Sequence, residues 1–557
     1  MKAPVRDRLG APLAPLAALA AWVAGLPNQF VQDDRPLLVQ NLRVHALANW
    51  REILSSPFWP PPYSQDLYRP LTALLLALQW ALGGGHPLVF RIVSGVLYAG
   101  VAVAVLRLAR ALLPLWLAVG VALLFAAHPV HVEAEALAAG QSELLVGLLC
   151  CVAVLRYLTR RRSGELLARD WLVVGGCYLA ACLFKEQGLM LPALLAAAEL
   201  LLIRDAQPGR VRRLLPGYLL LLGLAALVLL ARAAALSGNL VGSFTADALT
   251  GLSLPQRALT MLRVVPQWAR LLLWPAHLQA DYSPQELVAS TGFGAREALG
   301  LLLLLGAALS AWLARRRAPV LSFGLCWTAI ALFPVSNVLV PTGILLAERT
   351  LLLPSIGLLL ALGGALELLA TLPVTPALRR RVPIGSAILL GLAVLAGLLR
   401  SVERQGAWRD ETRFRLRSAA DAPRSWRTQL SYGTALFELG EPVQAREAYQ
   451  RAAALAPAER RWRVYNDLAQ HYFASGDTRQ AVETLLESRE SDPGIEETWH
   501  YLVLGYLSLG AYPVARAEAD SALGRGFSAQ LFGELRAPAD TAERAHVPPG
   551  GIKIKVR

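Results

Sequence analysis

The sequence has little charge for its length. Only 17% of its 557 residues are Asp, Glu, Lys or Arg, whereas 55% are hydrophobic. Soluble domains average about 25% charged and about 45–50% apolar residues. The shortage of charge argues against an ordinary soluble protein, and the long apolar runs indicate a membrane protein.

Cysteine is also scarce, and its placement excludes two common roles. The five cysteines lie inside apolar runs and form no CxxC pair. Neither a zinc knuckle nor a disulfide framework is therefore indicated, and we expect small buried apolar side chains.

The charge that is present is mostly basic, with a formal net charge of +14. In a soluble protein this excess would suggest nucleic acid as a partner. In a membrane protein it is typical of arginines gathered in short cytoplasmic loops, so we expect no nucleic-acid partner.

The apolar runs predict an all-α, polytopic membrane bundle. A helix needs roughly 20 apolar residues to cross the hydrocarbon of a bilayer. The first run is interpreted as an uncleaved span rather than a signal peptide. Eleven spans are predicted, at residues 10–27, 88–106, 111–127, 138–156, 171–184, 188–203, 214–235, 297–314, 319–336, 349–372 and 383–400.

The loop charges give this bundle an orientation. With the N-terminus in the cytoplasm, arginines cluster in the inner loops, whereas the outer loops near 129–137 and 337–346 contain no Lys or Arg. This is the positive-inside pattern. Two long loops, 28–87 and 236–296, then face outward, and each contains an apolar piece, 71–82 and 258–274, that we expect to lie in the interface plane. Lys185 and Glu186 fall at the outer tip of a hairpin over 171–203.

The last third of the chain is polar and repetitive. Similar residues recur at periods of 36 and then 34, among them Gly440, Gly476 and Gly510. Such a period is a tetratricopeptide signature, and the concave face of such an array usually binds an extended peptide. A short helical cap without a ligand is the alternative. We predict a membrane domain over 1–401, three repeats over 402–536 and a flexible tail over 537–557.

Two adjacent acids, Asp33 and Asp34, follow the first span. One could act as a general base towards an attacking hydroxyl. Either could instead hold a divalent cation, Mg²⁺ or Mn²⁺, that neutralises a phosphate leaving group. The alternative is an ordinary solvated acid pair, because two adjacent aspartates are a weak motif alone.

Further charged residues are predicted at the same outer level of the membrane. Charges within a span are costly, which favours paired or functional roles. Arg69 could bind a lipid phosphate, or anchor its helix among headgroups. His128, His131 and Glu133 invite a metal interpretation, but a hydrogen-bonded or substrate-positioning role is favoured. A cavity with acids and bases together suits a phosphate-linked substrate. The remaining residues of this set are Lys185, Glu186, Arg232, Glu348 and Arg349.

Taken together, these residues occur in motifs that resemble one family. The chain is similar to the transmembrane and tetratricopeptide-repeat O-mannosyltransferases, members of the C superfamily of glycosyltransferases. The motifs, in chain order, are Asp33-Asp34, Tyr68-Arg69-Pro70-Leu71-Thr72, His128 to Ala134, Lys185-Glu186-Gln187, Trp274-Pro275, Ala280 to Pro284, Pro334 to Asn337, Ala347-Glu348-Arg349, Leu353-Pro354-Ser355 and Trp408 to Glu411.

The resemblance implies an inverting transfer of a sugar from a polyprenyl phosphate to an acceptor at the outer face, and mannose is the sugar that it favours. It implies an acid of the first outer loop as base or metal ligand, with Asp34 preferred to Asp33. Lys185, Arg232 and Arg349 would stabilise the departing lipid phosphate, and the repeats would present a protein acceptor. The span after the Arg69 motif carries Arg91, Ser94 and Tyr98, where the family pattern suggests His and Asn.

Two other functions are compatible with the sequence. One is a non-catalytic scaffold, in which the spans anchor repeats that recruit envelope proteins. The other is a carrier for lipid-linked sugar, which would need charges along a path to the midplane. The abundance of Ala, Leu and Arg suggests a GC-rich genome, so we expect a bacterial inner-membrane protein with its site and repeats on the periplasmic side.

Overall fold

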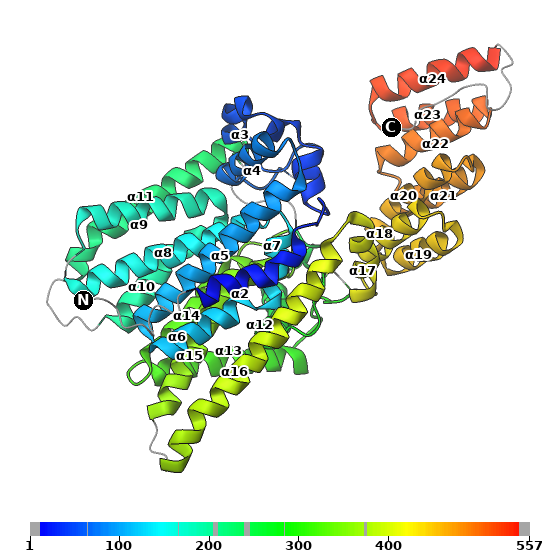
Figure 1. The fold of residues 1–557 in the computed structure, drawn as a ribbon. Coiled ribbons are helices and arrows are strands. Elements are labelled where there is room, and N and C mark those ends of the chain that lie inside the picture. The colour runs from blue at the N-terminus through cyan, green and yellow to red at the C-terminus, as the bar shows by residue number, and fades with distance from the viewer. Residues whose placement is uncertain are drawn as a thin grey trace. The chain divides into compact units, whose positions relative to one another are not determined.

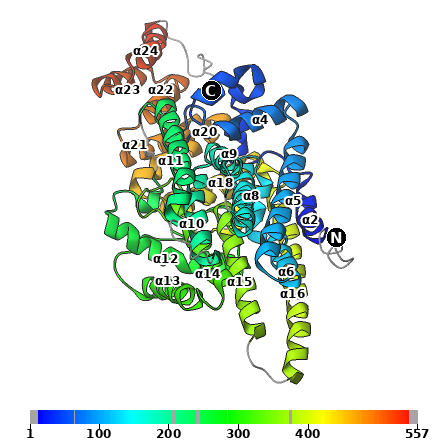
Figure 2. The ribbon, with the colours of Figure 1, turned by 90° about the vertical axis from the view of Figure 1, so that its left-hand side faces the viewer.

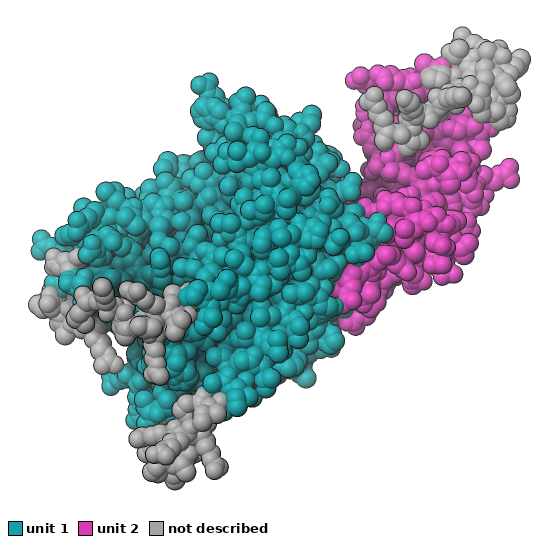
Figure 3. All heavy atoms as spheres, viewed as in Figure 1, with its two compact units in different colours: residues 1–414 teal, residues 415–557 magenta. Residues whose placement is uncertain are grey.

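The computed structural model describes residues 12–63, 65–164, 166–203, 210–238, 245–282, 285–371 and 376–544, with the backbone alone over 376–384 and 538–544. Across these ranges the regular structure is helical and contains no strand. The chain divides into two compact units, residues 1–414 and 415–557 (Figure 3).

A helix is found at each of the eleven predicted spans (Figure 1). The first is short, α2 (Leu13–Trp22), and a 3₁₀ turn, η1 (Val23–Gly25), extends it. The others are α5 (Pro87–Leu112), α6 (Leu115–Ala126), α8 (Gln141–Ser163), α9 (Ala168–Phe184), α10 (Leu191–Leu202), α11 (Arg210–Ala235), α13 (Ala295–Ala314), α14 (Pro319–Leu332), α15 (Leu352–Thr371) and α16 (Pro376–Gln405).

The predicted count of eleven spans is not confirmed. Among the described residues, six helices are long and apolar enough to cross a membrane. A seventh is added if α6 and residues 129–136, which are bent by 46° at a short break, form one span. Helices such as α10, with 12 residues, fall short because 1.5 Å per residue gives them only about 18 Å. The protein is therefore multi-pass, with several shorter apolar helices packed among the full-length ones.

Small residues let the central helices of the first unit approach closely. A Cβ atom on Gly324 of α14 would lie 2.4 Å from the carbonyl oxygen of Gly357 in α15. Three helices contribute less to this core, because only 17% of the apolar window of α11, 17% of that of α13 and 6% of that of α16 is buried. Their exposed leucines are suited to contact with lipid. Figure 2 shows α15 and α16 extending side by side beyond the other helices.

Each of the two long loops contains a helix at its predicted apolar piece: α4 (Pro70–Gly83) in the first and α12 (Leu254–Leu273) in the second. The first loop also has α3 (Trp50–Ser55), which was not predicted. Helix α4 ends at Gly84, which adopts the left-handed conformation (φ +57°) that glycine allows. Short turns between the long helices complete the unit: η2 (Arg35–Val39), η5 (Pro129–His131), α7 (Val132–Ala136), η6 (Glu186–Met190) and η9 (Glu348–Leu351).

The second unit consists of antiparallel helix pairs. After α17 (Glu411–Asp421), the pairs are α18 (Trp426–Glu438) with α19 (Pro442–Leu455), α20 (Arg461–Ala474) with α21 (Thr478–Ser491), and α22 (Glu496–Ser508) with α23 (Tyr512–Gly524). Gly440, Gly476 and Gly510 join the helices of each pair with positive φ angles. A last helix, α24 (Ala529–Arg544), continues past the predicted start of the tail at 537, and residues 545–557 lie outside the described residues.

Candidate active site

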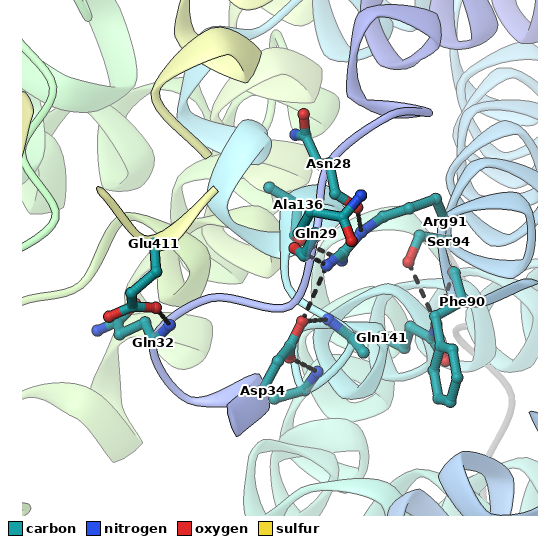
Figure 4. Close-up of polar contacts among 12 residues, drawn as sticks. Asn28, Gln29, Gln32, Asp34, Phe90, Arg91, Ser94, Ala136, Gln141 and Glu411 are labelled. Carbon is teal, nitrogen blue, oxygen red and sulfur yellow. Dashed lines mark hydrogen bonds and ion pairs between the residues drawn. The ribbon is translucent and has the colours of Figure 1, made fainter. Parts of the chain in front are cut away.

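The segment after the first helix is held by a buried arginine from α5. The side chain of Arg91 is 1% exposed. Its Nε donates to the carbonyl of Asn28 (3.2 Å), its Nη2 to that of Gln29 (2.8 Å), and its Nη1 to that of Ala136. Nη2 also pairs with Asp34 (3.1 Å), so one side chain fixes the loop at three points (Figure 4).

Asp34 is completely buried, and hydrogen-bond donors use both of its oxygens. Oδ2 accepts from Arg91 and from the N–H of Ala138 (3.0 Å), and Oδ1 accepts from the N–H of Ala139 (3.1 Å). Burial raises the pKa of Asp34, while the charge of Arg91 and the two N–H groups oppose that rise. This carboxylate ties the loop to the segment before α8, and no reacting hydroxyl can reach it without breaking those bonds.

Asp33 lies in a more open position, with its side chain 20% exposed, and pairs with Arg349 at 3.0 Å. Arg349 comes from η9 and is itself held by Glu133 of α7. Glu133 accepts from the Arg349 backbone N–H (2.9 Å) and from its Nη1 (2.9 Å). The loop acid, the arginine and the buried glutamate therefore form one chain of ion pairs.

A second group of charges surrounds the hairpin tip between α9 and α10. Lys185 pairs with Glu143 of α8, and Glu186 accepts from Arg69 (2.9 and 3.0 Å) and Arg232 (3.2 Å). Burial lowers the pKa of Lys185; Glu143 opposes this shift, and the charges of Arg69 and Arg349 add to it. Lys185 is therefore coupled electrostatically to a residue of each group, Arg69 and Arg349.

The ion pairs of the two groups join four acids to four bases. Four acids, Asp33, Glu133, Glu143 and Glu186, face four bases, Arg69, Lys185, Arg232 and Arg349. Each base has an internal carboxylate partner, which offsets much of the cost of burial. A ligand with a phosphate group could bind here by replacing the carboxylates as partners of these cations. The guanidinium groups of the arginines can donate two parallel hydrogen bonds to a phosphate.

The other predicted positioning residues lie in a neighbouring polar network. His131 contacts the Tyr98 hydroxyl (3.0 Å) and Ser355 (2.9 Å), and His128 contacts the carbonyl of Leu272 (3.0 Å). Glu348 accepts from Tyr282 (2.7 Å) and from the N–H of Gln279 (2.5 Å). These side chains are buried and join the loops to the helix bundle.

The two aspartates do not fit a resident divalent cation. Both oxygens of Asp34 already accept hydrogen bonds from the protein, and the Asp33 carboxylate already faces a guanidinium. Magnesium requires several oxygen ligands in near-octahedral geometry, and no group of three or more candidate ligands is placed for a metal among the described residues.

Sequence reasoning did not assign Arg91, Glu143 or Glu411 to the site. Arg91 and Glu143 each lie inside a predicted span, and a charge at such depth was the available signal. Glu411 gave no such signal, because it lies in a polar segment; only the structure places its carboxylate against the N–H of Gln32 (3.1 Å).

Known proteins match this chain in sequence. The tetratricopeptide repeat model matches residues 436–503. Protein O-mannosyl-transferase TMTC3 of Homo sapiens is 26% identical over 413 residues, which cover 69% of this chain and 44% of that protein. Protein O-mannosyl-transferase TMTC4 of Mus musculus is 27% identical, covering 78% of this chain and 64% of the relative. The chain resembles the TMTC proteins.

That result confirms the resemblance predicted from the motifs. The chain spans about half the length of these TMTC relatives, from 44% to 64%. Among solved structures, ArnT from Cupriavidus metallidurans in the apo state matches with a TM-score of 0.37 and 15% identity, over 90% of this chain and 79% of ArnT. The TMTC resemblance rests on the sequence matches, and the site geometry described above is independent of them.

Proposed function

We propose that this protein is a membrane glycosyltransferase that moves a sugar, with mannose as the first candidate, from a polyprenyl-phosphate donor to an acceptor hydroxyl on protein. The TMTC relatives are named protein O-mannosyl-transferases, which supports the sugar and the kind of acceptor. The phosphate-linked donor is supported by the four cations of the cluster.

The observation that carries the proposal is the different environment of the two loop acids. Asp34 is enclosed by donors, whereas Asp33 is partly exposed beside Arg349. A general base must reach the proton that it accepts, so we assign that role to Asp33 and a positioning role to Asp34. This reverses the order of preference that the motif alone suggested.

The reaction then proceeds as a single displacement. The acceptor oxygen forms a bond to the anomeric carbon as the bond from that carbon to the phosphate oxygen breaks, which inverts the configuration. The hydroxyl proton passes to Asp33, and the electron pair of the broken bond leaves on the lipid phosphate. Lys185, Arg69 and Arg232 would stabilise that developing charge.

Arg349 has a further role in this scheme. While it is paired with Asp33, the guanidinium occupies the carboxylate oxygen that would accept the proton. A donor phosphate would compete for Arg349, which Glu133 keeps at the site through the backbone and the side chain. Donor binding would thus release Asp33 only when a substrate is present.

The proposed location follows the loop charges. We place the N-terminus in the cytoplasm of a bacterium, and the cluster and the repeats on the outer side of the inner membrane. The repeats would hold a peptide or protein acceptor on their concave face. The membrane lipid and the polyprenyl-phosphate sugar are the remaining partners.

The test uses purified full-length protein in nanodiscs with polyprenyl-phosphate-mannose and cell-envelope acceptor proteins. We expect mannose transfer that is unaffected by a chelator, because the aspartates do not fit a metal. Asp33→Asn should lower the rate about 10²–10⁴-fold, the usual contribution of a general base, with an unchanged melting temperature.

Two matched variants complete the design. Glu52→Gln alters an exposed acid of the same outer loop and should leave transfer unchanged. Asp34→Asn should instead lower the melting temperature, because it weakens a buried ion pair. Full activity in Asp33→Asn would remove the assigned base, and activity that requires the repeats but not Asp33 would favour the scaffold function.

A further inference from the structure

The end of α16 and the segment after it are hydrogen-bonded to the first long loop. The side-chain amide of Asn28 donates to the Gln405 carbonyl (3.1 Å), and the N–H of Gln29 donates to the carbonyl of Arg409 (2.8 Å). A Cβ atom on Gly25 would lie 2.5 Å from the Gln405 side-chain oxygen. Two segments far apart in sequence therefore lie in direct contact immediately before the acid pair.

Glu411 makes another hydrogen bond to the same loop. Its Oε2 accepts from the backbone N–H of Gln32 at 3.1 Å. Figure 4 shows the Glu411 carboxylate beside Gln32, on the side of the loop away from Arg91. Arg91 binds Asp34 and Glu411 binds the backbone of Gln32, so the residues on both sides of Asp33 in the chain are held in place.

Gln32 has an unusual backbone conformation for its residue type. Its φ is +48°, one of three positive values among the described non-glycine residues. A non-glycine residue in the left-handed region costs of order 1 kcal/mol, and such residues persist only where neighbouring groups hold them. The carboxylate of Glu411 is the side chain that holds the N–H of Gln32.

Apolar packing places Glu411 for this contact. Val31 of the loop and Trp408 are each at most 1% exposed, and they form one cluster with Val132, Ala136, Leu137 and Phe414. Val31 precedes Gln32 in the chain, and Trp408 and Phe414 stand on either side of Glu411, so packing among these apolar residues brings the Glu411 carboxylate close to Gln32. The bond is charge-assisted, which makes it stronger than a neutral one.

We infer that Glu411 is a positioning residue for the transfer reaction, holding Gln32 in its strained conformation so that Asp33 faces the reacting hydroxyl. This rests on the proposed function, in which Asp33 is the base. Glu411 is also the first residue of α17, the helix that continues into the repeat unit. The segment leading to the acceptor-binding repeats therefore sets the position of the base.

The first experiment needs no activity. Hydrogen exchange of the Gln32 amide is measured in the full-length protein in nanodiscs, for the unaltered chain and for Glu411→Ala. Loss of a charge-assisted bond should speed exchange by about tenfold or more. Asp410→Ala is the matched control, because Asp410 accepts from the N–H of Arg413 at the start of α17 (2.8 Å) and its side chain makes no hydrogen bond or ion pair with the described residues of the loop. It should leave the Gln32 amide protected.

The second experiment measures transfer from polyprenyl-phosphate-mannose. Glu411→Ala should lower kcat about tenfold with an unchanged KM for the donor, since the cationic cluster is intact. Glu411→Gln should restore most of kcat, because its amide oxygen still accepts from the Gln32 N–H. A merely structural role would change the melting temperature and would not give this split between kcat and KM.

The outcomes separate the two proposals. Unchanged Gln32 exchange in Glu411→Ala would overturn the positioning role whatever the activity. Fast exchange with unchanged kcat would also overturn it, because the loop would then be released without consequence. Absence of transfer by the unaltered protein would instead contradict the proposed function and leave the exchange result to decide whether Glu411 holds the loop.

Discussion

Asp33 and Arg349 form an ion pair of 3.0 Å that joins the first long loop to the turn before α15. The same Nη1 of Arg349 lies 2.9 Å from the buried Glu133. One guanidinium therefore serves an accessible acid and a buried acid at once. Those two contacts have different consequences, one for reactivity and one for stability, and variants can separate them.

Arg349→Gln should lower both the stability of the protein and its transfer activity, and a second substitution should restore only the stability. The variant leaves Glu133 buried without its cation, and breaking a buried pair costs about 3–5 kcal/mol. We expect a clear fall in melting temperature and loss of transfer. Adding Glu133→Gln removes the unpaired charge, so the double variant should regain much of the stability while transfer stays low.

The measurement is a double-mutant cycle on melting temperature, with initial transfer rates for each variant. Arg349→Lys is the control: it keeps a positive charge beside both carboxylates, so it should lose less stability and less transfer than Arg349→Gln. Recovery of transfer in Arg349→Gln/Glu133→Gln would contradict the role of Arg349, and additive losses of stability would contradict the pairing.

The contact between α12 and α13 depends on the absence of a side chain at Gly300. A Cβ atom there would lie 1.9 Å from the carbonyl oxygen of Leu262, whereas one on Gly306 of the same helix would meet nothing within 4 Å. Gly300→Ala should therefore destabilise the protein by about 1–3 kcal/mol, and Gly306→Ala should not. Melting temperatures of the two variants decide the matter; equal values would mean that α12 does not pack on α13 as described.

Much of the membrane unit could be predicted from the sequence, because apolar runs mark helices whatever their neighbours. Helices occur at each of the eleven predicted positions. Sequence alone did not distinguish full spans from shorter apolar helices, since the run at 188–203 includes the η6 turn and leaves only 12 residues for α10. Helix length depends on where turns form, and those turns depend on tertiary contacts.

Most of the charged residues of the cluster were named from the sequence, whereas Arg91, Glu143 and Glu411 were missed and the different environments of the two aspartates were not foreseen. Acids and bases at one predicted level of the membrane indicated a common cluster, and the structure brings Asp33, Lys185, Glu186 and Arg349 together. Adjacent residues in a sequence look equivalent, however. Asp34 differs from Asp33 because Arg91 and the N–H groups of Ala138 and Ala139 enclose it, and those contacts depend on packing between distant segments.

The orientation of the chain can be tested by cysteine labelling. Ser55, at the end of α3, and Ser163, at the end of α8, are both exposed. In intact bacterial cells or right-side-out vesicles, a membrane-impermeant maleimide should label Ser55→Cys and leave Ser163→Cys unlabelled until the membrane is opened. The chain without these substitutions is the control for its five native cysteines. The reverse pattern would place the cluster in the cytoplasm.

The repeat unit should show a pH dependence that comes from Asp467 of α20. Burial raises the pKa of Asp467 to about 6, Arg463 opposes the rise and Glu497 adds to it. In the unfolded chain this carboxyl would lose its proton near its ordinary value of 3.8. Because the folded unit holds the proton more tightly, its free energy of unfolding should fall as the pH rises from about 4 to about 6, and remain lower above that range.

Asp467→Asn isolates this effect from that of two histidines. Burial lowers the pKa of His471 and of His500, so these groups should make the unit more stable as the pH rises through their ordinary range. The Asn variant keeps both histidines but cannot ionise at 467. Its melting temperature should match that of the unaltered chain near pH 4 and exceed it by a few degrees at pH 7.5.

The readout is thermal unfolding of the full-length protein in detergent, followed at several pH values between 4 and 8. Glu483→Gln, which removes an exposed acid of α21, is the matched control and should reproduce the unaltered profile. An Asp467→Asn profile parallel to that of the unaltered chain would show that Asp467 is ionised equally in the folded and unfolded states. Burial and the charge of Glu497 would then not raise the pKa of this carboxyl. The predicted fall in the free energy of unfolding with rising pH would be wrong.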